Sequence, residues 1–532
     1  MWRSSLRIAL LLAVLTLVLT PGRVSLAQRA GGTLTIISQD VSIGMNPLIE
    51  TVYQHIPRLV YNGLVDYSPY PDHKIVPGLA ESWQVSSDAK TYTFKLRRGV
   101  KWQDGADLTS ADVAFTYMKL TDPKSGSAYA TLVPAVERVD TPDALTAIIR
   151  LREPGPAFLA WTWLGVLPKH IWEKEDLKGS EYNRKPIGSG PYRLVSWAKG
   201  DSMVFEANPT YFKGRPGIDR VILKVVPDLN VAFAALERGE LDGFFFRGLV
   251  GGVPWPIVER LKKNPAFVVN EFPVSSIQNM HFYMENPVLR NLKVRQALAH
   301  AIDRPAVINN VLFGKGVIID NPVVSLTFGP DLYNTNVQKY AHDPAKANKL
   351  LDEAGYARAG NGTRFPLVIY GTPGARAKMD EIIQENLRAV GIETTMENFE
   401  WGSYDERFRV TKVLGKTGIF SVLSTPKVPN PDDSLGFVYG KNAKVSGGRN
   451  FSDYVNPKID QLIEQSRREG DAAKRAELYK QIQVILAEDL PMFPIYSPMG
   501  VDIWRANVKG LATSEFGGST LTSLEGARIE GR

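Results

Sequence analysis

Six histidines are the first residues to search for catalytic or metal-binding chemistry, and no two of them lie within four positions of each other. This spacing excludes the paired-histidine helix of metalloproteases, and no aspartate-rich calcium loop occurs. The chain also lacks cysteine, which excludes thiolate nucleophiles, zinc-thiolate sites and disulfides. Since no Gly-x-Ser-x-Gly elbow occurs either, we expect no enzyme, no cofactor and no metal site. A secreted hydrolase whose serine, histidine and aspartate lie far apart in the sequence stays open as an alternative.

The residue types that remain suit a ligand-binding groove, which aromatic side chains and a few placed charges typically line. Residues 400–404 read EWGSY and follow a predicted strand at 392–396; residues 425–434 read TPKVPNPDDS and follow a predicted strand at 418–423. Composition alone favours a surface turn with solvated charges for the second stretch. The candidate ligand-binding residues are Trp401, Tyr404, Lys427, Asp432 and Asp433, with Arg247 and Arg407 added by residue type as partners for a carboxylate.

The clearest element that must support such a site is a hairpin within residues 77–105. In its second strand Tyr92, Phe94 and Leu96 alternate with polar residues, which is typical of a half-buried strand. Thr109 and Asp112 then form the capping-box pattern that predicts the start of a helix.

An alternating pattern follows in the second half of the chain. A predicted strand at 366–370, an amphipathic helix ending near 390 and a strand at 392–396 indicate an α/β unit with parallel pairing. The stretch 53–64 reads as a further helix. The glycines at 188 and 190 precede a predicted strand rather than a helix, which argues against a phosphate-binding loop.

The N-terminal 27 residues have the pattern of a secretory signal. Arg3 and Arg7 precede an apolar run at 8–19, and Ser25-Leu26-Ala27 predicts cleavage before Gln28. The apolar run is too short to span a bilayer. Because no cysteine exists to be acylated, we expect an exported periplasmic protein that is not a lipoprotein. The net charge of +7 is spread without basic runs, so we expect no nucleic-acid partner.

The amino-acid sequence of the hairpin and its helix resembles the signature of the family 5 extracellular solute-binding proteins of bacterial ABC importers, which include oligopeptide, dipeptide and nickel receptors. The resemblance rests on AESW at 80–83, TYTFKLR at 91–97, VKWQDG at 100–105 and TSADV at 109–113, where Ser110 departs from the family's usual Thr-Ala-Asp-Val. RQALAHAIDR at 295–304 matches a later family segment. The matching segments occur in the family's order along nearly the whole mature chain.

The resemblance implies an α/β fold of two lobes, a periplasmic binding protein fold of type II with an extra inserted subdomain. It implies a monomer that captures a small molecule or short peptide and delivers it to the permease subunits of an ABC importer in the inner membrane. The expected division is a signal peptide at 1–27, lobe I at 28–57, 189–281 and 495–532, the inserted subdomain of lobe I at 58–188, and lobe II at 282–494.

One departure from the family bears on the ligand. In peptide-binding members an aspartate about four residues before the proline of the second stretch pairs with the α-ammonium of the peptide. Counting back from Pro431 gives Lys427, which cannot neutralise an ammonium. Either Asp432 or Asp433 takes over, or the ligand presents a carboxylate or hydroxyls. A peptide or peptide-like solute is therefore the expectation, with a sugar, an opine or a metal chelate as the alternative.

Overall fold

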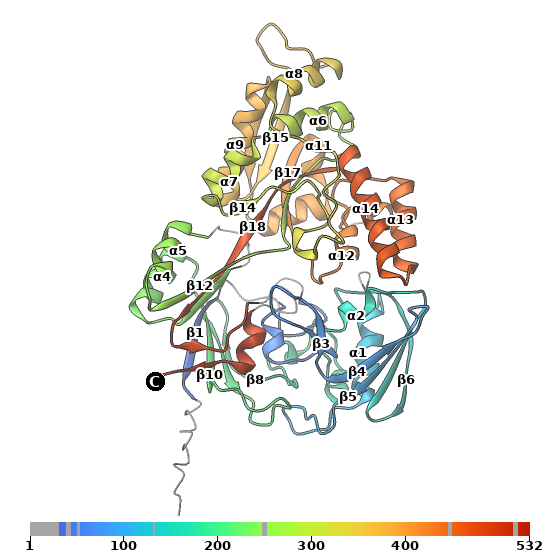
Figure 1. Cartoon of the computed structure of the whole chain (residues 1–532), viewed down its shortest axis with the longest axis vertical. Helices are drawn as coiled ribbons and strands as arrows, with labels where there is room; N and C mark the ends of the chain where they lie inside the picture. The colour runs from blue at the N-terminus through green and yellow to red at the C-terminus, as the bar shows by residue number, and fades with distance from the viewer. Residues whose placement is uncertain are drawn as a thin grey trace, which may run out of the picture.

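The computed structural model describes residues 31–38, 44–50, 54–130, 133–246, 253–444, 449–513 and 520–531. Two lobes are stacked along the long axis of the molecule, and the N-terminal half of the chain forms most of the lower one (Figure 1). The predicted signal peptide and Arg247 lie outside the described residues. No helix in the described ranges has the length and apolarity required to cross a membrane.

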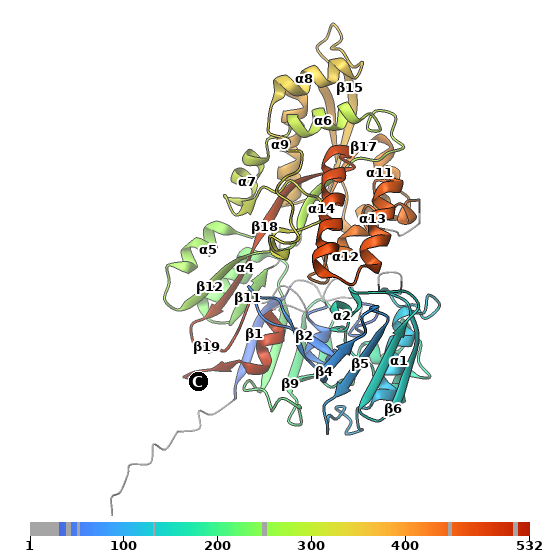
Figure 2. The ribbon, with the colours of Figure 1, turned by 45° about the vertical axis from the view of Figure 1, so that its right-hand side comes forward.

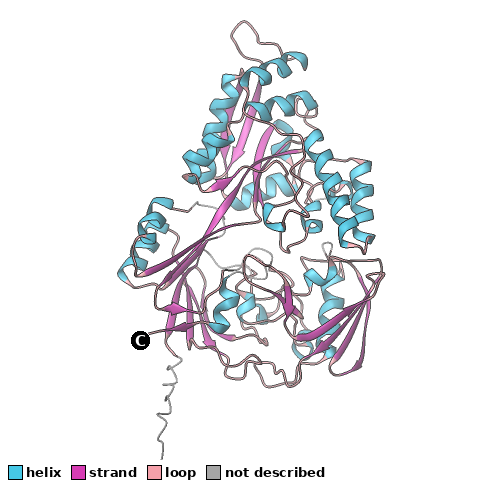
Figure 3. Cartoon of the chain, viewed as in Figure 1, coloured by secondary structure: helices cyan, strands magenta, loops and turns pink. Residues whose placement is uncertain are grey.

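A single mixed sheet passes through both lobes. Its strand order is β16-β15-β17-β13-β18-β11-β1-β10-β9-β8, and β12 and β14 also pair with β18. The long strand β18 (Met492–Arg505) pairs antiparallel with β13 (Ile277–His281) through its first residues and with β11 (Gly243–Phe246) and β12 (Phe267–Pro273) through its last. It therefore runs from one lobe into the other, as the strand colouring makes plain (Figure 3).

Lobe II contains the predicted α/β unit. The strands β15 (Phe365–Gly371) and β16 (Ile392–Asn398) are parallel, and α9 (Ala375–Ala389) connects them. The strand β17 (Gly418–Ser424) pairs parallel with β15 on its other side. The other helices of this lobe include α6 (Leu292–Ala301), α7 (Arg304–Leu312), α8 (Pro344–Glu353), α11 (Val413–Thr417), α13 (Pro457–Arg468) and α14 (Ala472–Asp489), and the short strand β14 (Gly316–Val317) lies beside β18.

The predicted hairpin forms the inserted subdomain together with a second hairpin. Strands β4 (Ala80–Val85) and β5 (Thr91–Leu96) pair antiparallel, and the four-stranded order is β4-β5-β7-β6. The helix α1 (Ser110–Thr121) begins as predicted, with the Thr109 N–H donating to the Asp112 carboxylate at 2.8 Å. The other elements of this subdomain are β2 (Val65–Tyr67), β3 (Ile75–Pro77), β6 (Val136–Asp143), β7 (Thr146–Leu151), α2 (Phe158–Trp161) and α3 (Lys169–Trp172).

The rest of lobe I completes the shared sheet. Asp228 caps α4 (Leu229–Arg238), and Gly239 ends it with a positive φ of 86°, the left-handed conformation that glycine favours. The remaining elements are β1 (Thr33–Ser38), β8 (Tyr192–Ala198), β9 (Ser202–Ala207), β10 (Arg220–Val225), α5 (Trp255–Lys262), β19 (Val508–Lys509) and β20 (Arg528–Ile529).

The predicted helix at 53–64 is wrong over its described part. Of residues 54–64 only Pro57–Leu59 form a single 3-10 turn. The chain then runs extended, because the Leu64 N–H donates to the Thr162 carbonyl at 2.8 Å and Gly63 packs directly against the backbone of Trp163. Tertiary pairing thus overrides the local helical pattern.

The hydrophobic cores fall into two sets. Two clusters draw on residues 34–269 and 499–529, and two draw on residues 277–496. One fully buried side chain crosses this division: Val428, which belongs by sequence to the second set, packs into the largest cluster of the first. We propose on this basis that lobe II corresponds to 282–494 and that lobe I comprises the other segments, including the subdomain at 58–188.

Candidate functional site

The loop at 425–430 connects β17 to the short helix α12 (Pro431–Leu435) and lies where the lobes meet. Asn430 caps this helix by accepting the Asp432 N–H at 3.0 Å, and Pro431 occupies its first turn. Because Val428 is buried in the core of lobe I, the loop is held against that lobe. Figure 2 shows α12 at the lower end of lobe II, above α2 of the inserted subdomain.

Asp433 is fully engaged by protein donors. Its carboxylate lies 2.5 Å from the Arg449 guanidinium and accepts the Lys427 backbone N–H at 2.6 Å through its other oxygen. The Arg449 guanidinium in turn lies 4.3 Å from the centre of the Phe437 ring. Asp433 is buried, so these contacts compensate its charge.

Asp432 is engaged in the same way by another element. Its carboxylate accepts from Arg467 Nε at 2.7 Å, which ties α12 to α13. The Arg467 guanidinium also lies 4.8 Å from the centre of the Tyr439 ring. Thus both aspartates of the predicted site are buried and ion-paired in this conformation.

Lys427 differs from both aspartates. The residue as a whole is partly exposed, and its ammonium makes no hydrogen bond or ion pair within the described ranges. Burial by surrounding protein lowers the pKa of Lys427, while Asp433 and Glu50 oppose that shift and Arg449 adds to it. The structure therefore places, at the position predicted from the sequence, a lysine that two acids influence but that forms no direct ion pair within the described ranges.

The facing wall of lobe I is built from Glu50, Gln54 and Tyr129. The Tyr129 hydroxyl donates to the Glu50 carbonyl at 2.7 Å, and Gln54 Nε2 donates to the Tyr129 hydroxyl oxygen at 2.8 Å. Burial raises the pKa of Tyr129, and the charges that act on it include those of Asp433 and Arg449. This wall and the loop of lobe II are therefore electrostatic neighbours.

The other candidates lie on or beside α10 (Trp401–Asp405). Trp401 is 43% exposed, whereas Tyr404 is fully buried and its hydroxyl donates to the Ser421 carbonyl at 2.8 Å. Arg407, in the π-helical turn Glu406–Val410, is exposed and lies over the Phe399 ring at 4.5 Å. In this conformation Tyr404 therefore fixes the strands behind the helix, and the other two face solvent.

Two neighbours of Lys427 were missed by sequence reasoning. Arg449 follows Asp433 by 16 residues, and Glu50 belongs to the other lobe. Neither lies in a motif, so their sequence positions carried no signal. Only the tertiary arrangement assigns them to this site.

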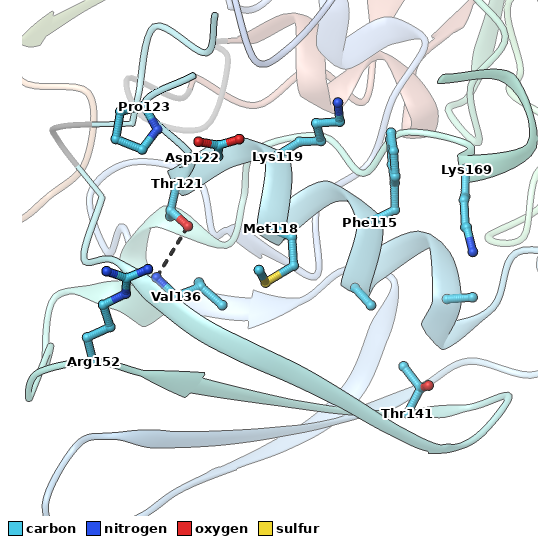
Figure 4. A pocket seen from close by; sticks show the side chains of 12 residues that line it. Phe115, Met118, Lys119, Thr121, Asp122, Pro123, Val136, Thr141, Arg152 and Lys169 are labelled. Carbon is cyan, nitrogen blue, oxygen red and sulfur yellow. Dashed lines mark hydrogen bonds between the residues drawn. The ribbon is translucent and has the colours of Figure 1, made fainter. Parts of the chain in front are cut away.

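A cavity of about 550 Å³ lies elsewhere, between α1 and β6 of the inserted subdomain. Figure 4 shows Phe115 and Met118 on α1 and Val136 and Thr141 on β6, with the Val136 N–H donating to the Thr121 hydroxyl oxygen at 3.2 Å. None of the predicted ligand-binding residues lines it. Within the described ranges no group of three or more histidine, aspartate or glutamate side chains could hold a metal ion.

Comparison with known proteins agrees with this architecture. The family model of the bacterial extracellular solute-binding proteins, family 5 Middle, matches residues 74–446. The dipeptide-binding protein of Escherichia coli strain K12 is 29% identical over 517 residues, which cover 91% of this chain and 93% of that protein.

Two solved structures share the fold. NikZ from Campylobacter jejuni in complex with Ni(L-His) has a TM-score of 0.83 at 25% identity. The match covers 93% of this chain and 99% of the NikZ chain. The oligopeptide-binding protein AppA from Bacillus subtilis in complex with a nonapeptide has a TM-score of 0.82 at 26% identity. The match covers 94% of this chain and 99% of the AppA chain. The two-lobed α/β fold is therefore that of the periplasmic binding proteins, and the chain belongs to the bacterial extracellular solute-binding proteins, family 5.

Proposed function

We propose that this solute-binding protein captures a peptide or peptide-like solute between its lobes and delivers it to the permease of an ABC importer in the inner membrane. The observation that carries the proposal is the packing of Val428, from the loop of lobe II, into the core of lobe I. The similarity to a dipeptide-binding protein and to a nonapeptide complex supports a peptide-like solute.

The proposed mechanism is closure of the lobes around the ligand. A ligand that contacts both lobes binds the closed form more tightly and shifts the population toward it. The permease would then recognise the closed form. On this mechanism the receptor releases its ligand unchanged.

We further propose that residues 1–27 direct export and are cleaved before Gln28, and that the mature monomer works in the periplasm without a lipid anchor. The pattern of the N-terminal segment and the lack of cysteine support this location. N-terminal sequencing of the secreted protein and its mass in solution test both statements.

A non-peptide solute is the second candidate. Lys427 favours it, because a cation occupies the place where the family resemblance leads one to expect an acid. The likeness to NikZ in complex with Ni(L-His) also supports a wider ligand range for this fold.

The deciding experiment is native mass spectrometry of the protein purified from the periplasm, followed by thermal unfolding with peptides, sugars and opine-like acids. A ligand present at about 100 times its dissociation constant should stabilise the fold by ~2.7 kcal/mol. Stabilisation by short peptides supports the proposal. Stabilisation by sugars or opines alone would replace it with the second candidate, and turnover of the ligand would replace it with an enzyme.

A further inference from the structure

The charges around the loop at 425–430 are buried unequally. The acids Glu50, Asp432 and Asp433 are 1%, 7% and 4% exposed, respectively. The cations Lys427 and Arg449 are both partly exposed. The two cations of this cluster are therefore more accessible to solvent than its acids.

The two aspartates are also engaged by donors of the protein itself. Each oxygen of Asp433 accepts from a protein donor, and Asp432 accepts from Arg467. The Lys427 ammonium has three N–H donors and no hydrogen-bond acceptor within the described residues. A ligand oxygen could accept from one of these N–H groups.

We propose that Lys427 binds a carboxylate of the solute and excludes solutes that present a free α-ammonium at this end. The inference rests on the proposed function and specifies the solute: a peptide-like molecule whose amino end is acylated, preferably by a group that carries a carboxylate. Glu50 lies close enough to act on Lys427, but it belongs to the opposite wall and is only 1% exposed.

The physical basis is the low dielectric between closed lobes. A second cation beside Lys427 would be opposed by direct repulsion that water screens weakly there. A carboxylate would form a charge-assisted hydrogen bond with the ammonium and replace the water that Lys427 loses on closure. One such bond corresponds to about a tenfold to hundredfold difference in affinity.

The test uses one tryptic peptone divided into three pools: untreated, N-acetylated and N-succinylated. A fourth pool contains small mono- and dicarboxylic acids without peptide bonds. Each pool is equilibrated with the full mature protein, bound species are identified by native mass spectrometry, and their dissociation constants are measured by calorimetry.

We expect wild-type protein to bind succinylated peptides most tightly, acetylated peptides less tightly and untreated peptides most weakly. The dissociation constants of succinylated and untreated peptides should differ by at least about tenfold. Lys427→Asp should reverse this order. Lys427→Met, which keeps the side chain's length without its charge, should bind all three pools within a few-fold. Lys346→Asp is the matched control, because this exposed lysine lies in α8 at the far end of lobe II and should leave the order unchanged.

The outcomes separate the two proposals. Equal or stronger binding of untreated peptides by wild-type protein overturns the role of Lys427 and leaves the peptide receptor standing. Binding of the fourth pool alone supports the carboxylate contact and overturns the peptide-like solute. If no pool binds wild-type or Lys427→Asp protein, both proposals fail.

Discussion

The carboxylate of Asp433 lies 2.5 Å from the guanidinium of Arg449, and the side chain of Asp433 has no exposed surface. The same carboxylate accepts the Lys427 backbone N–H, so it fixes the loop on which Lys427 stands. The acid beside the proposed ligand contact therefore acts on the protein's own groups.

Removing Arg449 should destabilise the protein strongly. Arg449→Met leaves a buried carboxylate without its partner, and we expect a loss of about 3–5 kcal/mol in the free energy of unfolding, measured in urea. The double variant with Asp433→Asn should recover part of this loss. Arg468→Met is the control, because its side chain is 62% exposed and 3.8 Å from Glu464, so its removal should cost less than about 1 kcal/mol.

His281 should make stability depend on pH. It is completely buried and stacks on Phe420 with ring centres 5.3 Å apart, and burial lowers its pKa to about 3. Since an unfolded histidine has a pKa near 6.5, the unfolded state binds the extra proton between these values. Stability contributed by neutral His281 is present above about pH 6.5 and is lost as the pH falls toward 3.

Between pH 6.5 and 5 the contribution of His281 to the free energy of unfolding should fall by about 2 kcal/mol, at roughly 1.4 kcal/mol per pH unit. Urea unfolding of wild-type protein and His281→Gln across pH 5 to 8 measures the difference between their slopes. Parallel slopes would contradict the burial of a neutral histidine.

Val428 should control closure of the lobes. Val428→Asp would bury an unpaired charge in the core of lobe I, so we expect the variant to favour an open form with a larger radius of gyration in small-angle scattering and weaker ligand binding. Val410→Asp changes a side chain that is 42% exposed in the same lobe and should leave both measurements unaltered. Equal scattering curves for wild-type protein and Val428→Asp would argue against this contact.

Gly188 should not tolerate a side chain. A Cβ atom there would lie 1.9 Å from the Val60 carbonyl oxygen, so Gly188→Ala must displace backbone and should cost about 3 kcal/mol in unfolding free energy. Gly402→Ala is the matched control in α10, where a Cβ has nothing within 4 Å, and it should be neutral or stabilise by up to about 1 kcal/mol. Similar melting temperatures for both variants would contradict the close packing.

Elements whose signals are local in sequence could be predicted. Thr109 and Asp112 meet within one turn, where the Thr109 N–H donates to the Asp112 carboxylate. The alternation of strand and helix likewise predicted the parallel pairing of β15 with β16. In each case the predicted element depends on residues that lie within the sequence pattern used to predict it.

The candidate site could be predicted only in part. Counting along the chain located Lys427, but its environment depends on Glu50 from the opposite lobe. Tyr404 and Trp401 are close in sequence, and only packing against β17 determines that the tyrosine is buried while the tryptophan is not. Such distinctions arise from tertiary contacts, which no local pattern encodes.

The position of β18 constrains when the protein can fold. This strand begins at Met492, close to the end of the chain, yet it pairs with strands in both lobes. Neither lobe can complete its sheet until residues 492–505 have been synthesised, after every other strand of that sheet. A chain exported from its N-terminus would therefore remain short of its native state during translocation, and loss of the C-terminal segment would remove a central strand from both lobes at once.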